Sequence, residues 1–393
     1  MKIALLTDAY QPIVSGVTTS ILMLKEGLEA LGHQVYVITT SAKGAKEYDK
    51  TEKGIIRLKG IPFPKKGLKH FRYIPFVRGH LKKIINLDLD VIHIHTEFSL
   101  GSLGKRVKDK TDLPLVFTVH TMYEEYFSYL SKLLNRFFKR PFKKGVKKLM
   151  NSFIRRAEVT ITPSLKTKAL MESYQLQGNY RIIPTGIDLE NFYQSSYSKT
   201  EVANLKASLN LKDEFVCLFV GRISEEKSID VIVKGFKKVS HLKMKLLIVG
   251  DGPYMSTLKA LVKKLNLESD VIFTGMIKWE DVGLYYQIGD LFLNASLSET
   301  QGLTYIEALA AGLPVIVKYD QVLEDVVKDY ENGIFFYQNE ELPALIEKVY
   351  QDKTLREKLT KNALLSVTQY SKENYALNVL KAYQEASALS QND

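Results

Sequence analysis

The sequence of 393 residues contains a single cysteine, Cys217. One thiol excludes any disulfide within the chain and leaves too few thiolates for a cysteine-based zinc cluster. No stretch reaches the roughly 18 uninterrupted apolar residues that a membrane-spanning helix needs. Residues 1–8 are too short for the apolar part of a signal peptide, and we expect a first strand there. The sequence therefore predicts a cytoplasmic protein without a transmembrane segment.

Acidic residues are missing from two long stretches. Residues 53–87 contain ten Lys and Arg but no Asp or Glu, and so do residues 132–156. The net charge of +11 is uneven, because residues 1–187 hold 32 basic against 15 acidic side chains, whereas residues 188–393 hold 23 against 29. A basic half of this size predicts an anionic partner.

A dinucleotide-binding signature is also missing. The first predicted strand is followed by Asp8-Ala-Tyr-Gln-Pro12 and not by G-x-G-x-x-G. This difference argues against an NAD site. An NAD-dependent oxidoreductase and a plain nucleotide-binding module remain as remote alternatives.

Short apolar runs alternate with helical patterns in both halves of the chain. The predicted strands are residues 3–7, 35–39, 91–95, 115–120 and 159–162, then 215–220, 245–249, 271–274, 291–294 and 315–317. This alternation predicts an α/β fold with two open parallel sheets, each covered by helices on both faces. We expect domains at residues 1–187 and 188–370, joined by a linker over residues 185–200. A helix within residues 371–393 would cross back to the first domain.

Charged side chains follow two predicted strands of the second half. Arg222 and Lys227 come after one strand, where cations are well placed to bind a diphosphate. Glu299 follows another strand, and Glu307 lies eight residues later. Between them, Gly302, Leu303 and Thr304 begin a predicted helix, whose free backbone N–H groups suit a phosphate. The alternative is that both glutamates are ordinary solvated surface charges.

These segments together resemble glycosyltransferase family 4. The resemblance is carried by Gly221-Arg-Ile-Ser-Glu-Glu-Lys227, Val249-Gly-Asp-Gly-Pro253, Glu299-x7-Glu307 with Gly302-Leu-Thr304, the segment 8–20 around Gly16, His93-Ile-His-Thr-Glu97 and Thr118-Val-His120. It extends over nearly the whole chain. The family implies a GT-B fold, in which two Rossmann-like β/α/β domains face a central cleft, and a reaction that retains the configuration of the transferred sugar.

The resemblance also implies roles for single residues. Arg222 and Lys227 would bind the donor diphosphate, Glu299 would accept hydrogen bonds from the donor sugar, and His120 would face that sugar; these four form the catalytic set. Glu307 would bind the ribose. The remaining donor contacts would come from Gly16, the amides of Gly302, Leu303 and Thr304, and Met276 and Ile277 at the uracil. For His120 the alternative is a buried histidine at a strand end.

The acid-free stretches interleave cations with aromatic and aliphatic side chains. The residues expected to bind a membrane are Lys65, Lys66, Lys69 and Arg72 in the first stretch, and Phe138, Lys139, Arg140, Phe142, Lys143, Lys144, Lys147 and Lys148 in the second. A basic amphipathic helix suits an anionic membrane surface. The alternative is that its apolar stripe, continued by Val146, Leu149 and Phe153, packs on the domain core. No nucleic acid is expected, because no nucleic-acid-binding motif is present.

A glycosyltransferase at a membrane surface needs a lipid acceptor. Within family 4 the pattern resembles the 1,2-diacylglycerol 3-glucosyltransferases, which implies UDP-glucose as donor, diacylglycerol as acceptor, and a peripheral position on the inner face of the cell membrane. The runner-up is a family member with another acceptor, such as a polysaccharide precursor or a phosphoinositol lipid. No tightly bound cofactor is implied. Mg²⁺ dependence stays open without protein ligands, because Asp88-x-Asp90 and His93-x-His95 are expected to be structural. The sequence predicts no oligomeric state.

Overall fold

The computed structural model describes residues 1–13, 15–41, 53–62, 72–120, 139–296, 299 and 301–391, with the backbone alone for residues 139–142. The chain divides into two compact units. The first is Met1–Ile187 together with Lys372–Asp393, and the second is Asp188–Ser371. In the part of the chain that the structure describes, no helix is both long and apolar enough to cross a bilayer.

The first unit is built on a seven-stranded parallel sheet in the order β3-β2-β1-β6-β7-β8-β9. Its strands are β1 (Lys2–Leu6), β2 (Gln34–Thr40), β3 (Ile55–Leu58), β6 (Val91–Ile94), β7 (Leu115–Thr118), β8 (Val159–Thr162) and β9 (Tyr180–Ile182). Two short strands, β4 (Ile61–Pro62) and β5 (Arg72–Tyr73), pair antiparallel beside it.

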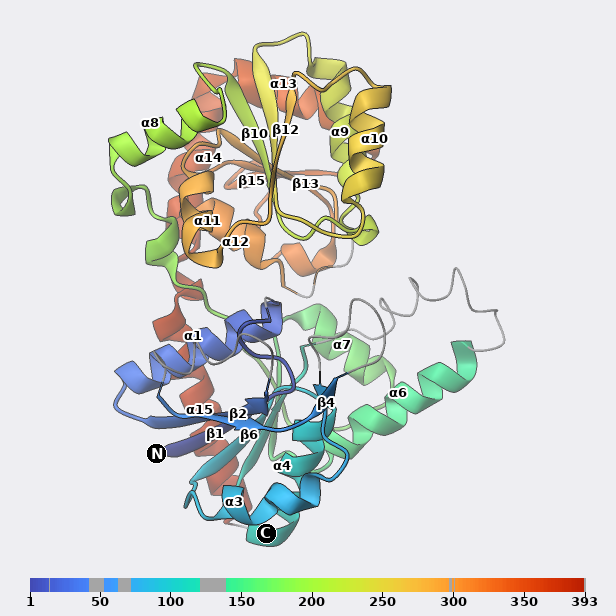
Figure 1. The fold of residues 1–393 in the computed structure, drawn as a ribbon, viewed down its shortest axis with the longest axis vertical. Coiled ribbons are helices and arrows are strands. Elements are labelled where there is room, and N and C mark those ends of the chain that lie inside the picture. Colours follow the sequence, from blue (N-terminus) through green and yellow to red (C-terminus); the bar gives the residue numbers. More distant parts are fainter. Residues whose placement is uncertain are drawn as a thin grey trace. The chain divides into compact units, whose positions relative to one another are not determined.

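Helices cover both faces of this sheet (Figure 1). They are α1 (Gly16–Ala30), η1 (Val77–His80), α3 (Leu81–Ile85), α4 (Ser99–Thr111), α6 (Lys139–Ile154), α7 (Leu165–Ser173) and α15 (Lys372–Ser390). One core cluster joins Leu6 and Phe117 of the strands to Leu103 of α4 and Phe153 of α6. On the opposite face, α15 packs against α1, β7 and β8.

The second unit is a six-stranded parallel sheet in the order β12-β11-β10-β13-β14-β15. Its strands are β10 (Phe215–Val220), β11 (Met244–Val249), β12 (Val271–Gly275), β13 (Leu291–Asn294), β14 (Val315–Lys318) and β15 (Gly333–Phe336). Its helices are η2 (Leu189–Phe192), η3 (Gln194–Ser196), α8 (Lys199–Ser208), η4 (Glu225–Lys227), α9 (Ile229–Val239), α10 (Met255–Lys264), α11 (Trp279–Tyr286), α12 (Leu303–Ala310), η5 (Gln321–Leu323), η6 (Asn339–Glu341), α13 (Leu342–Gln351), α14 (Lys353–Ser366) and η7 (Thr368–Tyr370).

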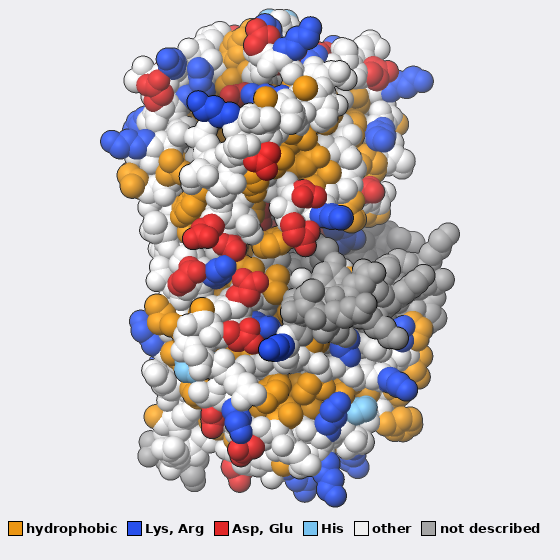
Figure 2. Space-filling model, turned by 60° about the vertical axis from the view of Figure 1, so that its left-hand side comes forward, with side chains coloured by type: hydrophobic (Ala, Val, Ile, Leu, Met, Phe, Trp, Pro, Cys, Tyr) orange, Lys and Arg blue, Asp and Glu red, His pale blue; other side chains and the backbone are white. Residues whose placement is uncertain are grey.

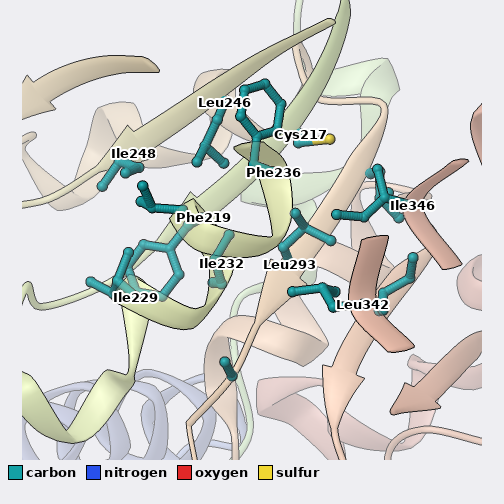
Figure 3. Close-up of a cluster of buried hydrophobic side chains, with 14 of the residues drawn as sticks. Cys217, Phe219, Ile229, Ile232, Phe236, Leu246, Ile248, Leu293, Leu342 and Ile346 are labelled. Carbon is teal, nitrogen blue, oxygen red and sulfur yellow. The ribbon is translucent and has the colours of Figure 1, made fainter. Parts of the chain in front are cut away.

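Apolar side chains from strands and helices meet in the core of the second unit. Figure 3 shows Phe219 of β10 and Leu293 of β13 beside Ile232 of α9 and Leu342 of α13. Strand β10 is apolar throughout, because a central parallel strand is covered on both faces.

The order of strands reverses at one place in each sheet. β1 and β6 are neighbours in the first sheet, and β10 and β13 are neighbours in the second. The loops that leave such a pair at its carboxyl end part toward opposite faces, which creates the usual ligand position of open α/β sheets. The two positions to inspect therefore lie after β1 and β6, and after β10 and β13.

The predicted linker is wrong beyond Asp188. This stretch packs onto the second unit, where Gln287 donates to the Phe192 carbonyl oxygen at 2.7 Å and a Cβ at Gly283 would lie 2.1 Å from the Tyr197 hydroxyl. Ser198 then caps α8 in a capping box with Glu201. The chain passes between the units at Ile187–Asp188 and at Ser371–Lys372.

The last helix is fixed to the first unit by a close approach to α1. A Cβ added at Gly27 would lie 2.6 Å from the Cβ of Ala376 and 2.8 Å from the backbone oxygen of Lys372. The Tyr375 hydroxyl and the Ser20 hydroxyl hydrogen-bond at 2.8 Å nearby. Gly27 therefore lets two helices pack backbone to backbone.

Gly27→Ala should destabilise the protein by about 1–3 kcal/mol, since the added methyl group overpacks this contact. Gly145→Ala is the matched control, because Gly145 lies in α6 with open space around it. Alanine should there gain up to about 1 kcal/mol from helix propensity. Melting temperatures that move in the same direction in both variants would contradict the packing argument.

Candidate active site

The loops after β10 and β11 touch through their backbones. A Cβ at Gly250 would lie 2.0 Å from the Gly221 oxygen, and one at Gly252 would lie 2.2 Å from the Ile223 oxygen. Gly250 also has a φ of +132°, which side-chain-bearing residues rarely adopt. The Val249-Gly-Asp-Gly-Pro253 motif thus lets the β11 loop support the loop that carries Arg222 and Lys227.

An ion pair connects the loops after β10 and β13. Lys227 Nζ lies 2.7 Å from Glu299 Oε1, and the two side chains are 22% and 12% exposed. Arg222 is exposed and forms no hydrogen bond or ion pair with a described residue. Arg222 is therefore an exposed cation near a partly buried ion pair, at the place where the order of strands reverses.

Gly302 is the N-cap of α12, and Glu307 lies about one turn into the helix. Gly302 caps the helix with a φ of +84°, and Leu303 and Thr304 form a first turn without any acidic side chain. Glu307 is buried and accepts a hydrogen bond from the Tyr286 hydroxyl at 2.7 Å. Burial raises the pKa of Glu307 to about 7, although the bond from Tyr286 opposes this shift. Glu307 is therefore a buried carboxyl group and not a solvated surface charge.

Met276 and Ile277 follow β12, two strands away from β10. Met276 is 75% exposed. An exposed methionine of this kind offers an apolar surface to a ligand ring.

The corresponding loops of the first unit are held together through a carboxylate. Asp8, directly after β1, accepts a hydrogen bond from the Thr96 hydroxyl at 2.7 Å, and the backbone N–H of Leu100 lies 3.2 Å from the same oxygen. Burial raises the pKa of Asp8 to about 6. Gly16 is exposed at the first position of α1.

Three histidines lie at the carboxyl ends of β6 and β7. His93 and His95 are buried, and His120 is partly exposed. His95 Nδ1 lies 3.0 Å from His120 Nε2. The described residues contain no group of three His, Cys, Asp or Glu side chains that could hold a metal ion. Asp88 and Asp90 instead contact Lys2, at the amino ends of β1 and β6 and away from the histidines.

Two models of known protein families match this chain, and each covers most of one unit. A model of "Glycosyltransferase Family 4" matches residues 14–191, and one of "Glycosyl transferases group 1" matches residues 201–366. The chain is 45% identical to alpha-monoglucosyldiacylglycerol synthase of Acholeplasma laidlawii, over 96% of this chain and 95% of that one. It is 36% identical to the enzyme of that name from Streptococcus pneumoniae, over 98% and 86%.

This chain belongs to glycosyltransferase family 4. It is a hexosyltransferase with the GT-B fold, built from two Rossmann-like units. The crystal structure of Anabaena HepE with UDP and glucose matches with a TM-score of 0.79 at 18% identity, over 98% of this chain and 99% of that chain. Sucrose-phosphate synthase from Thermosynechococcus elongatus matches with a TM-score of 0.78 at 23% identity, over 99% of both chains.

The basic surface of this family 4 enzyme differs in part from the prediction. Lys65, Lys66, Lys69 and Phe138 lie outside the described residues, as do the side chains of Lys139, Arg140 and Phe142. Lys143, Lys144 and Lys148 are exposed, but Lys147 donates to Gln175 and Arg72 to the Gly60 oxygen. The apolar stripe from Val146 to Phe153 packs on the core. The described part of this stripe therefore cannot face a membrane. It packs on the domain core, which was the alternative to membrane binding.

Exposed apolar side chains lie instead on β4, β5 and η1. Ile61 is 60% exposed, Tyr73 48% and Phe76 82%. Ile61 and Phe76 border a hollow of about 290 Å³, together with Lys59 and His80. We call Ile61, Tyr73 and Phe76 the apolar rim. Figure 2 shows hydrophobic side chains beside Lys and Arg side chains on the surface of the first unit.

Several residues of the site had no signal in the sequence. Tyr286 reaches Glu307 from α11, and Thr96 reaches Asp8 across the sheet. Tyr286 belongs to none of the motifs, and the motif that contains Thr96 gave no sign of its contact with Asp8, because these contacts join residues that are 21 and 88 positions apart in the sequence.

Glu307→Gln should raise the melting temperature more at pH 8 than at pH 5. A carboxyl group whose pKa is raised from 4.5 to about 7 on folding stabilises the fold below pH 4.5, and this contribution is lost as the pH rises through 7. The neutral amide avoids that loss. An equal effect at both pH values would show that burial does not perturb Glu307.

Proposed function

We propose that this enzyme transfers glucose from UDP-glucose to the 3-hydroxyl of 1,2-diacylglycerol at a membrane surface. The configuration of glucose is retained, and the product is alpha-monoglucosyldiacylglycerol. The observation that carries the proposal is the 45% identity to the Acholeplasma laidlawii synthase over nearly the full length of both chains. The solved structures with UDP, glucose and UDP-glucose have the same fold and support a nucleotide-sugar donor.

The donor binds at the loops after β10 and β13 in this proposal. Arg222 and Lys227 neutralise the diphosphate, and the amides of Gly302, Leu303 and Thr304 add donors to it. Glu307 accepts hydrogen bonds from the ribose, while Met276 and Ile277 contact the uracil. Gly16 supplies a backbone approach to the diphosphate from the first unit.

The reaction follows from where charge develops. When the glycosidic bond to phosphate breaks, negative charge grows on the departing UDP, and the two cations oppose it. Glu299 holds sugar hydroxyls and already has Lys227 as its partner, so the ion pair joins the sugar to the leaving group. No tightly bound cofactor is needed, because the donor carries its own leaving group. A Mg²⁺ requirement, if present, would be met by the diphosphate oxygens.

The acceptor side is a membrane surface in this proposal. A protein with this basic first unit binds reversibly to anionic lipids on the inner face of the cell membrane, at roughly 1 kcal/mol per engaged Lys or Arg. The apolar rim supplies side chains that can enter the interface, with Lys59, Arg78 and Lys82 exposed in the same region.

A panel of UDP- and GDP-sugars against diacylglycerol in anionic vesicles tests the proposal. UDP-glucose should be consumed fastest, with a product whose anomeric proton shows an α linkage. Turnover of another nucleotide sugar, or transfer only to a phosphoinositol lipid or a soluble acceptor, would replace the donor or the acceptor proposed here.

Arg222→Ala and Lys227→Ala should lower kcat by about 10²- to 10³-fold and raise the donor KM less, since their charges matter most as UDP leaves. Lys234→Ala is the control, because Lys234 pairs with Asp230 on the exposed surface of α9. Steady-state kinetics with varied UDP-glucose measure both constants. A change in KM alone would remove both cations from leaving-group stabilisation.

Ile61→Ser combined with Phe76→Ser should weaken binding to anionic vesicles and leave UDP binding intact. Leu365→Ser is the matched control, because Leu365 is 69% exposed on the second unit. Co-sedimentation at low and high salt separates the two forces, since charge attraction is screened within about 3 Å at 1 M salt. Wild-type binding by the serine variant would exclude the apolar rim from the membrane contact.

A further inference from the structure

The histidines after β6 and β7 form a connected stack inside the first unit. His93 Nδ1 lies 2.8 Å from the Tyr383 hydroxyl of α15, and His93 Nε2 lies 2.7 Å from the Thr118 hydroxyl. The ring centroids of His93 and His95 are 4.0 Å apart. The ring planes of His95 and His120 are nearly parallel, with an angle of 20° between them. A continuous series of contacts therefore runs from Tyr383 of α15 through His93 and His95 to His120.

The stack is built from neutral rings. Burial lowers the pKa of His93 and of His95 well below the usual value, and it lowers the pKa of His120 to about 4. A neutral imidazole carries one N–H, so one of its nitrogens donates and the other accepts. The contact between His95 Nδ1 and His120 Nε2 then needs a donor on one side only.

The surroundings of His95 decide which side donates. His95 Nε2 is buried and has no hydrogen-bond partner among the described residues. A proton on this nitrogen would be a buried donor without an acceptor, whereas a proton on Nδ1 meets His120 Nε2 at 3.0 Å. The favourable tautomer of His95 therefore donates from Nδ1. His120 Nε2 is then an acceptor, and the single proton of His120 must sit on its Nδ1.

We propose that His95 is a positioning residue for His120: it donates its Nδ1 proton to His120 Nε2 and holds His120 as the tautomer with an N–H at Nδ1. This inference rests on the proposed function and on the role that the family resemblance implies for His120, which is to face the donor sugar. His120 then offers a hydrogen-bond donor to a sugar oxygen. It does not act as a general base through Nδ1, because that nitrogen already carries the proton.

Nitrogen NMR of the [¹⁵N]histidine-labelled wild-type enzyme tests the tautomer without any substrate. Long-range proton–nitrogen correlations distinguish a protonated from a bare ring nitrogen. We expect His120 to carry its proton on Nδ1, and His95→Leu to shift it toward Nε2, the form that free histidine favours in water. A wild-type His120 protonated on Nε2 would overturn the inference, whether or not the enzyme transfers glucose.

Kinetics of two variants separate positioning from packing. The side-chain amide of His95→Asn can donate from the place of Nδ1, whereas His95→Leu fills similar space without a donor. His95→Leu should lower kcat by about tenfold or more, with a smaller rise in the donor KM, and His95→Asn should restore much of the loss. The exposed His241 gives the control His241→Leu, which should change neither kcat nor the His120 signals.

Equal kcat losses in both His95 variants, with equal falls in melting temperature, would reduce His95 to a packing role. Wild-type kcat in His95→Leu would also contradict the inference. If the wild type shows the expected tautomer but transfers no sugar to diacylglycerol, the proposed function fails and the histidine contact stands.

Discussion

The ion pair between Lys227 and Glu299 joins the two loops of the second unit to which the proposed donor site belongs. Its members come from the loops that follow β10 and β13, which are neighbouring strands although Lys227 and Glu299 are 72 positions apart in the sequence. Both side chains are mostly buried, so each would be costly without the other. The pair fixes a cation and a carboxylate where a sugar diphosphate would need both, and the open Arg222 adds a second cation beside them.

The first unit repeats this arrangement with different chemistry. Asp8 after β1 is bound to Thr96 after β6, and these strands are also the neighbours at which the order reverses. In both units a polar side chain after the central strand thus reaches across to the loop of the adjacent one. The first unit uses buried hydrogen bonds and neutral histidines, whereas the second uses opposite charges. This difference supports the proposal that the second unit binds the charged diphosphate.

The central strands could be predicted from the sequence because they are buried on both faces. Residues 159–162, 215–220 and 291–294 are β8, β10 and β13 as predicted. Of the strands in the two large sheets, β3, β9 and β15 were missed. β3 and β9 each include an arginine and are partly exposed, and β15 is short and begins with a glycine, which is depleted in strands.

The motif residues Arg222, Lys227, Glu299 and Glu307 could be predicted from the sequence. Arg222, Lys227 and Glu299 lie in the loops after β10 and β13. The contacts of Tyr286 and Tyr383 could not be predicted, because they depend on helices that pack against distant segments. The apolar stripe of α6 shows the limit of periodicity, which does not distinguish a core from a membrane.

In the proposed function, the loops after β10 and β13 form the nucleotide-binding position. Hydrogen exchange of the backbone amides, with and without UDP, tests it most directly. UDP should slow exchange in residues 221–229 and 301–310 and leave α6 unchanged, whereas NAD should slow exchange in neither segment. Protection by UDP that is absent from these two segments, or equal protection by NAD, would contradict a nucleotide-binding position at these loops.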